Sequence, residues 1–172
     1  MKGMLDIEFI LAIAIFIGTS SFILLTINSR MPFLEEKSDF NNIMAESYRI
    51  SDVLIYGSGT PGWESAINAN PDSVERIGLS GGRRFYLSSE KLLSLNTFCN
   101  PPVAENYVKL NSMLTSRGGV EIQVTDRAGS ALVSCQPPKA IGLSQYTARR
   151  TVLLDKSPLP PEILAVDVTV TG

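Results

Sequence analysis

Residues Phe9–Ile27, FILAIAIFIGTSSFILLTI, form a run of 19 residues without a charge or a proline. As an α-helix at 1.5 Å per residue this run is about 28 Å long, close to the hydrocarbon thickness of a bilayer. It therefore predicts a transmembrane helix near the start of the chain. Two alternatives are a buried core helix, which the rest of the chain would have to cover on every side, and a removable secretory signal.

The residues around this run fit a secretory signal poorly. Such a signal has a positive start, a shorter apolar region and a small-residue cleavage site. Lys2 is the only positive side chain ahead of the run, and the exit at 28–30, Asn-Ser-Arg, offers no Ala-x-Ala. Two acids, Asp6 and Glu8, also precede the run. Acids at that position need another explanation.

The N-terminal segment MKG-MLDIE-FILAIAIFIG resembles the start of a type IV pilin precursor. Such precursors carry a short basic leader ending in Gly, then a mature N-terminus whose fifth residue is Glu, then an unbroken hydrophobic helix. The resemblance implies cleavage after Gly3 by a prepilin peptidase, with Lys2 and Gly3 ending the leader and Met4 as the first mature residue. Counted from Met4, Glu8 is the fifth residue.

A lone carboxylate at the edge of a hydrophobic helix is costly unless it is paired. Cleavage after Gly3 would create a positive amine on Met4, and the resemblance implies that Glu8 pairs with such an amine, its own or a neighbour's, during assembly. The alternative is an acid at the membrane surface. Archaeal relatives often start Gln-x-Ser-x-Glu with a Leu four residues after the Glu. This chain has Met4, Asp6 and Ala12 there, but it keeps the Gly-then-Glu spacing.

The resemblance implies an α+β, type IV pilin-like fold in three parts. Residues 1–3 are the leader, residues 4–55 form a long N-terminal helix, and residues 56–172 form an extracytoplasmic head with a small antiparallel sheet. The transmembrane part is expected over about 9–27, with a kink near Pro32 because proline interrupts helical hydrogen bonding. Helical periodicity beyond it places five apolar residues on one face: Phe40, Ile43, Met44, Ile50 and Leu54.

Local patterns predict the elements of the head, with a sheet of about four strands. Short strands are expected at 77–80 and 84–87, and helices at 89–96 and 103–115. Residues 120–125 and 166–171 alternate between apolar and polar side chains, as half-buried strands do. Further strands are expected at 131–135 and 151–154.

Cys99 and Cys135 are the only cysteines. Outside the cell an even number of cysteines fits one disulfide, and a 36-residue separation makes it worth roughly 3–4 kcal/mol. Unpaired thiols are the alternative. A metal site is not expected, because two thiolates without histidine cannot complete a tetrahedral shell.

The composition argues against catalysis and nucleic-acid binding. The chain has no histidine, a net charge of −2 and no extended basic run, so His-dependent hydrolase sites and a basic nucleic-acid surface are not expected. Three segments match the sequence patterns of catalytic or cofactor-binding motifs: G-x-G-x-x-G at 57–62, G-x-S-x-G at 78–82 and S-x-x-K at 88–91. Each lacks its structural context or companion residues. We expect no catalytic residues and no cofactor.

The expected function is that of a membrane-anchored, type IV pilin-like filament subunit, archaeal in style. Lys2 precedes the helix and acids follow it, which favours a cytoplasmic N-terminus and an extracellular head. Gly18, Ser20 and Ser21 would permit close helix packing in a filament. The implied partners are other pilin subunits, the peptidase, and an assembly platform with its ATPase. Two alternatives are a minor pilin or pseudopilin and a single-pass binding protein that does not assemble.

Overall fold

The computed structural model of this chain describes residues 2–114, 116, 118–137, 144–156 and 159–172. Its first helix, α1, spans Lys2–Tyr56, and the side chains described in α1 are those of residues 7–29 and of residues 37 onward. The chain divides into two compact units, residues 1–39 and residues 40–172. We describe each unit by itself.

Unit 1 contains the apolar part of α1. Ile7–Ser29 has a mean hydropathy of 2.5 over a stretch of 23 residues, and none of it is buried. It is long and apolar enough to cross a membrane. The helix continues through Pro32.

Three hydroxyl groups of this apolar stretch, those of Thr19, Thr26 and Ser29, are bonded within the helix. The Thr19 hydroxyl donates to the Ile15 carbonyl at 2.9 Å, and the Thr26 hydroxyl donates to the Phe22 carbonyl at 2.8 Å. These bonds follow from the helical spacing, which places each hydroxyl beside the carbonyl four residues earlier. The two threonines therefore need no water or second chain as a hydrogen-bond partner.

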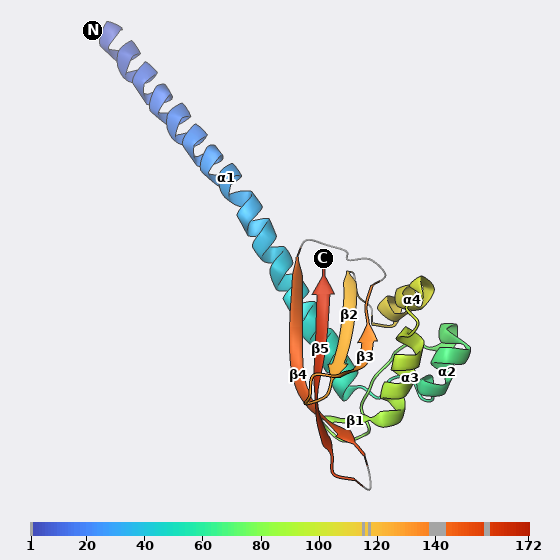
Figure 1. Ribbon diagram of the computed structural model, residues 1–172. Helices are drawn as coiled ribbons and strands as arrows, with labels where there is room; N and C mark the ends of the chain where they lie inside the picture. Colours follow the sequence, from blue (N-terminus) through green and yellow to red (C-terminus); the bar gives the residue numbers. More distant parts are fainter. Residues whose placement is uncertain (1, 115, 117, 138–143, 157–158) are drawn as a thin grey trace. The chain divides into compact units, whose positions relative to one another are not determined.

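Unit 2 is built on a five-stranded sheet with the strand order β1-β4-β5-β2-β3 (Figure 1). The strands are β1 (Tyr86–Ser88), β2 (Gly119–Thr125), β3 (Ala131–Cys135), β4 (Gln145–Asp155) and β5 (Glu162–Thr171). β5 is central and pairs antiparallel with both β4 and β2. β2 pairs antiparallel with β3, whereas β1 runs parallel to β4.

The expected α+β class, with a long N-terminal apolar helix, is confirmed, but the expected antiparallel sheet of about four strands is corrected. It has five strands and is mixed, because the three residues of β1 pair in parallel with the end of β4. Residues 77–80 form no strand, since only an isolated bridge joins Ser80 to Leu87. β4 also begins six residues before the strand expected at 151–154.

The core lies on one face of this sheet. Along β5 the even-numbered residues from Leu164 to Val170 are all at most 1% exposed. Residues 40–56 of α1 contribute the side chains of Ile50, Leu54 and Ile55 to the same core cluster. Ile43 is buried as expected, whereas Phe40 is 44% exposed although the helical period placed it on the same apolar face.

Three short helices complete the core beside β3 (Figure 1). They are α2 (Trp63–Ala69), α3 (Ser89–Cys99) and α4 (Ala104–Leu114), with one 3-10 turn at Pro71–Ser73. α2 was not expected from the sequence. Its Trp63 is 1% exposed and belongs to the core. The expected helices at 89–96 and 103–115 correspond to α3 and α4.

Candidate functional site

The residues expected to be processed lie at the start of α1. The backbone of Lys2, Gly3 and Met4 is helical, and their side chains lie outside the described part of the structure. Glu8 is exposed and is the second residue of the apolar stretch. Among the described side chains, none forms an ion pair with Glu8. An acid at the rim of an otherwise uncharged apolar helix is therefore the main chemical feature of unit 1.

Cys99 and Cys135 form a disulfide in unit 2, with their Cα atoms 5.1 Å apart. Cys99 ends α3 and Cys135 ends β3, so the bond ties a helix to an edge strand of the sheet. Both residues are buried, at 8% and 2% exposure.

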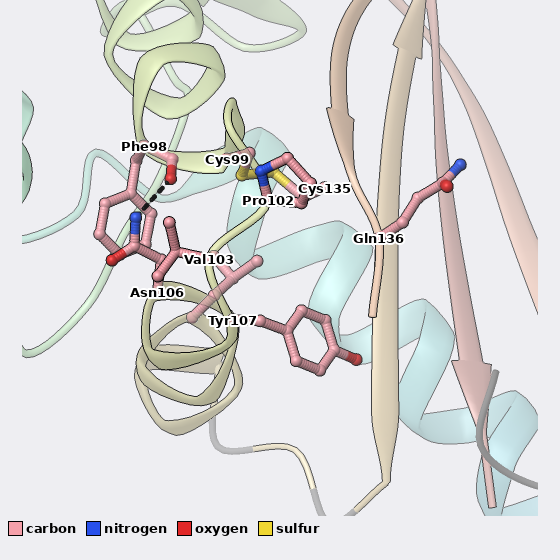
Figure 2. A pocket seen from close by; sticks show the side chains of 9 residues that line it. Phe98, Cys99, Pro102, Val103, Asn106, Tyr107, Cys135 and Gln136 are labelled. Atoms are coloured by element: carbon pink, nitrogen blue, oxygen red, sulfur yellow. Dashed lines mark hydrogen bonds between the residues drawn. A yellow bond between two sulfur atoms is a disulfide. The ribbon is translucent and has the colours of Figure 1, made fainter. Parts of the chain in front are cut away.

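A cavity lies against this disulfide, between α3, α4 and the end of β3 (Figure 2). Its lining includes Val103, Asn106, Tyr107 and Gln136 besides the two cysteines. The Asn106 amide donates to the Phe98 carbonyl at 2.8 Å and holds the start of α4 against the end of α3. The cavity measures about 10 Å³, which is room for about one water molecule. It is a packing defect rather than a ligand site.

The three segments that match catalytic motif patterns, 57–62, 78–82 and 88–91, come together around Lys91. The Lys91 ammonium donates to the Ser58 carbonyl at 2.7 Å and to the Ser80 carbonyl at 3.1 Å. The Ser88 hydroxyl accepts from the Lys91 backbone N–H and caps α3. The Ser80 hydroxyl accepts from the Gly82 N–H. The Lys91 ammonium thus joins two segments through their main-chain carbonyls, and the hydroxyl groups of Ser80 and Ser88 both have structural partners.

The glycines at 57–62 serve close packing. Gly59 has φ 75°, and a Cβ there would lie 2.5 Å from Cδ1 of Trp63. The Trp63 indole N–H donates to the carbonyls of Ser58 and Gly78, at 3.2 and 3.1 Å. This loop follows α1 and leads into α2, so it lacks the strand that a dinucleotide-binding loop requires.

An aromatic cluster lies where α1 crosses β4. The hydroxyl groups of Tyr48 and Tyr146 are hydrogen-bonded at 3.0 Å, and the rings of Phe40 and Tyr48 both lie 5.8 Å from the Tyr146 ring. The hydrogen bond with Tyr48, together with partial burial, raises the pKa of Tyr146 above its ordinary value of 10.0. The Arg150 guanidinium lies over the Tyr48 ring and is ion-paired with Asp52 at 3.0 Å.

The opposite face of the sheet carries a two-pronged ion pair. Nε and a terminal nitrogen of Arg149 donate to the two carboxylate oxygens of Asp167, at 2.7 and 2.6 Å. The carboxylate raises the pKa of Arg149. This pair joins β4 to β5 at a register position where Arg149 is opposite Asp167. Alternation in the sequence places Asp167 on the polar face, but only the strand pairing reveals its partner.

Among the described residues, no group of three or more His, Cys, Asp or Glu side chains could hold a metal ion. No family model, no curated protein and no solved structure matches this chain. Its function must therefore be argued from its own residues.

Proposed function

We propose that this chain is a type IV pilin-like subunit of a membrane-anchored extracellular filament. The observation that carries the proposal is the apolar stretch Ile7–Ser29, which has no buried residue. A water-exposed apolar surface of this length requires a cover, either lipid or other apolar helices. A filament subunit uses both covers in turn: the bilayer before assembly and a helical bundle afterwards.

Glu8 distinguishes a filament subunit from a simple anchor. An anchor gains nothing from an acid at the rim of its membrane helix, because the carboxylate must be paired or kept hydrated. The resemblance to pilin precursors supplies the partner, an amine created at Met4 by cleavage after Gly3. Pairing between the Glu8 carboxylate of one copy and the Met4 amine of the next would favour docking of helices in one register.

The hydroxyl bonding within α1 supports the same role. Because Thr19 and Thr26 satisfy their hydroxyl groups on their own helix, neither adds an unsatisfied donor to an apolar environment. The disulfide of unit 2 agrees with a head outside the cell, where disulfides persist. The prepilin peptidase, the assembly platform and its ATPase are the partners implied by this function.

The first test is the N-terminal mass of the native protein extracted from membranes. We expect a chain that begins at Met4. A chain that begins at Met1 would contradict processing as a prepilin and would leave an uncleaved single-pass anchor as the function of the helix.

The second test compares two acids at the start of the helix. Glu8→Ala is expected to abolish filaments, measured by electron microscopy and by the amount sheared from cells, while membrane insertion stays normal. Asp6→Ala is the matched control, because it removes the same charge two residues away, and it should leave assembly intact. Normal filaments from Glu8→Ala would overturn the pairing mechanism.

A further inference from the structure

A strained turn opens β1 in unit 2. The Tyr86 N–H donates to the Arg83 carbonyl at 3.1 Å, which closes a β-turn with Arg84 and Phe85 at its corners. Phe85 has φ 64° and is the one non-glycine residue with positive φ in the described part of the chain. Glycine or asparagine is usual at such a corner, and a bulky aromatic residue there is an outlier. Conformational strain of this kind is concentrated at functional positions.

The strain places Phe85 beside the end of α1. The Phe85 and Tyr56 rings lie 5.5 Å apart in an edge-to-face arrangement, and the Arg84 guanidinium lies 5.5 Å from the centre of each ring. Both rings are exposed, Tyr56 at 42% and Phe85 at 44%. We call Tyr56, Arg83, Arg84 and Phe85 the arginine–aromatic patch.

The two arginines of this patch have no acidic partner among the described residues. Among the described residues, neither Arg83 nor Arg84 takes part in an ion pair. A guanidinium beside two rings keeps N–H groups for a carboxylate, since the cation–π attraction does not use up its hydrogen-bond donors. Exposed arginine and tyrosine side chains are also enriched at the centres of protein interfaces. The patch is therefore prepared for an acidic partner.

We propose that the arginine–aromatic patch docks onto the acidic stretch 35–39 of a second copy of this chain, a proposal that rests on the filament function above. The argument is charge complementarity. Residues 35–39 carry Glu35, Glu36 and Asp39 against Lys37, a net charge of −2, and Asp39 is exposed.

The two docking surfaces belong to different units of the chain, the acidic stretch to unit 1 and the patch to unit 2. Because the two docking surfaces differ, the contact between copies is heterologous and repeats from one copy to the next, as an extended assembly requires.

Charge reversal in the full-length chain tests the pairing. Arg83→Glu with Arg84→Glu should lower the amount of sheared filament at least about tenfold, because like charges would then face each other. Glu35→Arg with Glu36→Arg should lower it in the same way. The four substitutions together should restore filaments to within about threefold of the unmodified chain, because attraction is re-established with the signs exchanged. Arg127→Glu, which reverses another exposed arginine of unit 2, is the control and should assemble normally.

Phe85→Gly separates docking from folding. Glycine removes the exposed ring and also relieves the positive φ, so the variant should unfold at the same temperature as the unmodified chain or higher. Its filament yield should nevertheless fall. A fall in filament yield without a loss of thermal stability would support a docking role for the ring.

The outcomes separate this proposal from the filament function. If Arg83→Glu with Arg84→Glu assembles normally while Glu8→Ala does not, docking at the patch is overturned and the filament function stands. Loss of assembly without rescue by the reversed acids would overturn the stretch 35–39 as the partner. If the unmodified chain forms no filament in its native membrane, both proposals fail.

Discussion

At the scale of single residues, Ser47 is the closest link between α1 and the sheet. Its hydroxyl donates to the Val168 carbonyl at 2.8 Å and accepts from the Ala148 N–H at 3.0 Å. Those two residues are opposite each other on β5 and β4, so one buried hydroxyl ties a helix to two strands. The sequence offers no sign of this, since a serine within a helical segment is usually interpreted as a solvent-facing residue.

Ser47→Ala should lower the free energy of unfolding by about 1–3 kcal/mol, because the Ala148 N–H and the Val168 carbonyl would each lose a buried partner. Denaturant unfolding of the full chain in detergent measures this loss. Ser112→Ala is the control, because its exposed hydroxyl donates to the Lys109 carbonyl of its own helix. It should change stability by less than about 0.5 kcal/mol. Equal effects of the two substitutions would contradict the bridging role.

Tyr146 makes the folding stability of unit 2 depend on pH in the alkaline range. Its raised folded pKa means that the folded state keeps the phenol proton to a higher pH than the unfolded chain does. This contribution to stability is complete below about pH 10 and is lost as the pH rises through the folded pKa. Tyr48→Phe removes the main cause, so Tyr146 should titrate closer to its ordinary value. Carbon NMR of labelled tyrosines measures the midpoint, and an unchanged midpoint would disprove the assignment.

At the scale of elements, local patterns predicted position better than pairing. The alternation of Val166, Val168 and Val170 with polar residues identified most of β5. In a half-buried strand, successive side chains point to the core and to solvent in turn, so the sequence alternates between apolar and polar residues. The first half of β4, Gln-Tyr-Thr-Ala-Arg-Arg, shows no comparable apolar alternation. Its inward-facing positions include Tyr146 and Arg150, whose polar ends find partners on α1. Such a strand cannot be recognised before its contacts are known.

The parallel pairing of β1 could not be predicted for a related reason. β1 has three residues and pairs with β4 across more than 60 positions of sequence, so nothing local specifies its direction. The turn at Phe85 sets where β1 begins, and a positive φ at phenylalanine contradicts the usual turn preferences. The arginine–aromatic patch was missed in the same way, because Tyr56 and Phe85 come together only through tertiary structure. The processing site expected within residues 1–8 rests on a local pattern and stays a prediction.

The disulfide joins the end of α3 to the end of the edge strand β3. Replacing both Cys99 and Cys135 with alanine should lower the free energy of unfolding by roughly 3–4 kcal/mol, because the unfolded chain regains the freedom of a 36-residue loop. Urea unfolding with and without reductant measures the effect. Reductant should destabilise the unmodified chain and leave the double variant unchanged. Equal stability of the two chains without reductant would refute this contribution.

At the scale of the whole molecule, apolar surface is distributed very unevenly between the units. Unit 2 buries most of its large apolar side chains in one cluster, whereas the apolar stretch of unit 1 is uncovered. The same residue types therefore have opposite roles in the two units. In unit 2 the apolar side chains stabilise the fold by packing against one another. In unit 1 they require an apolar environment that the described chain does not supply.

A charge placed in unit 1 should therefore matter more than one placed in unit 2. Ile17→Arg should weaken membrane insertion, since a central arginine costs about 2.5–3.5 kcal/mol on biological insertion scales. Carbonate extraction of membranes measures the inserted fraction. Leu93→Arg is the matched control, because Leu93 is similarly exposed on α3, at 67% against 57% for Ile17. Its insertion should be normal. Equal insertion of the two variants would count against a membrane-spanning role for the stretch.

The central position of β5 also determines when the sheet can form during synthesis of the chain. β5 holds β4 and β2 together, yet it follows every other strand along the chain. The sheet cannot close before residue 171 has been synthesised, whereas the apolar helix leaves the ribosome first. The apolar helix is therefore complete in the nascent chain while the sheet of unit 2 is still open. For the filament subunit proposed above, a head that folds late would not block its own passage across the membrane.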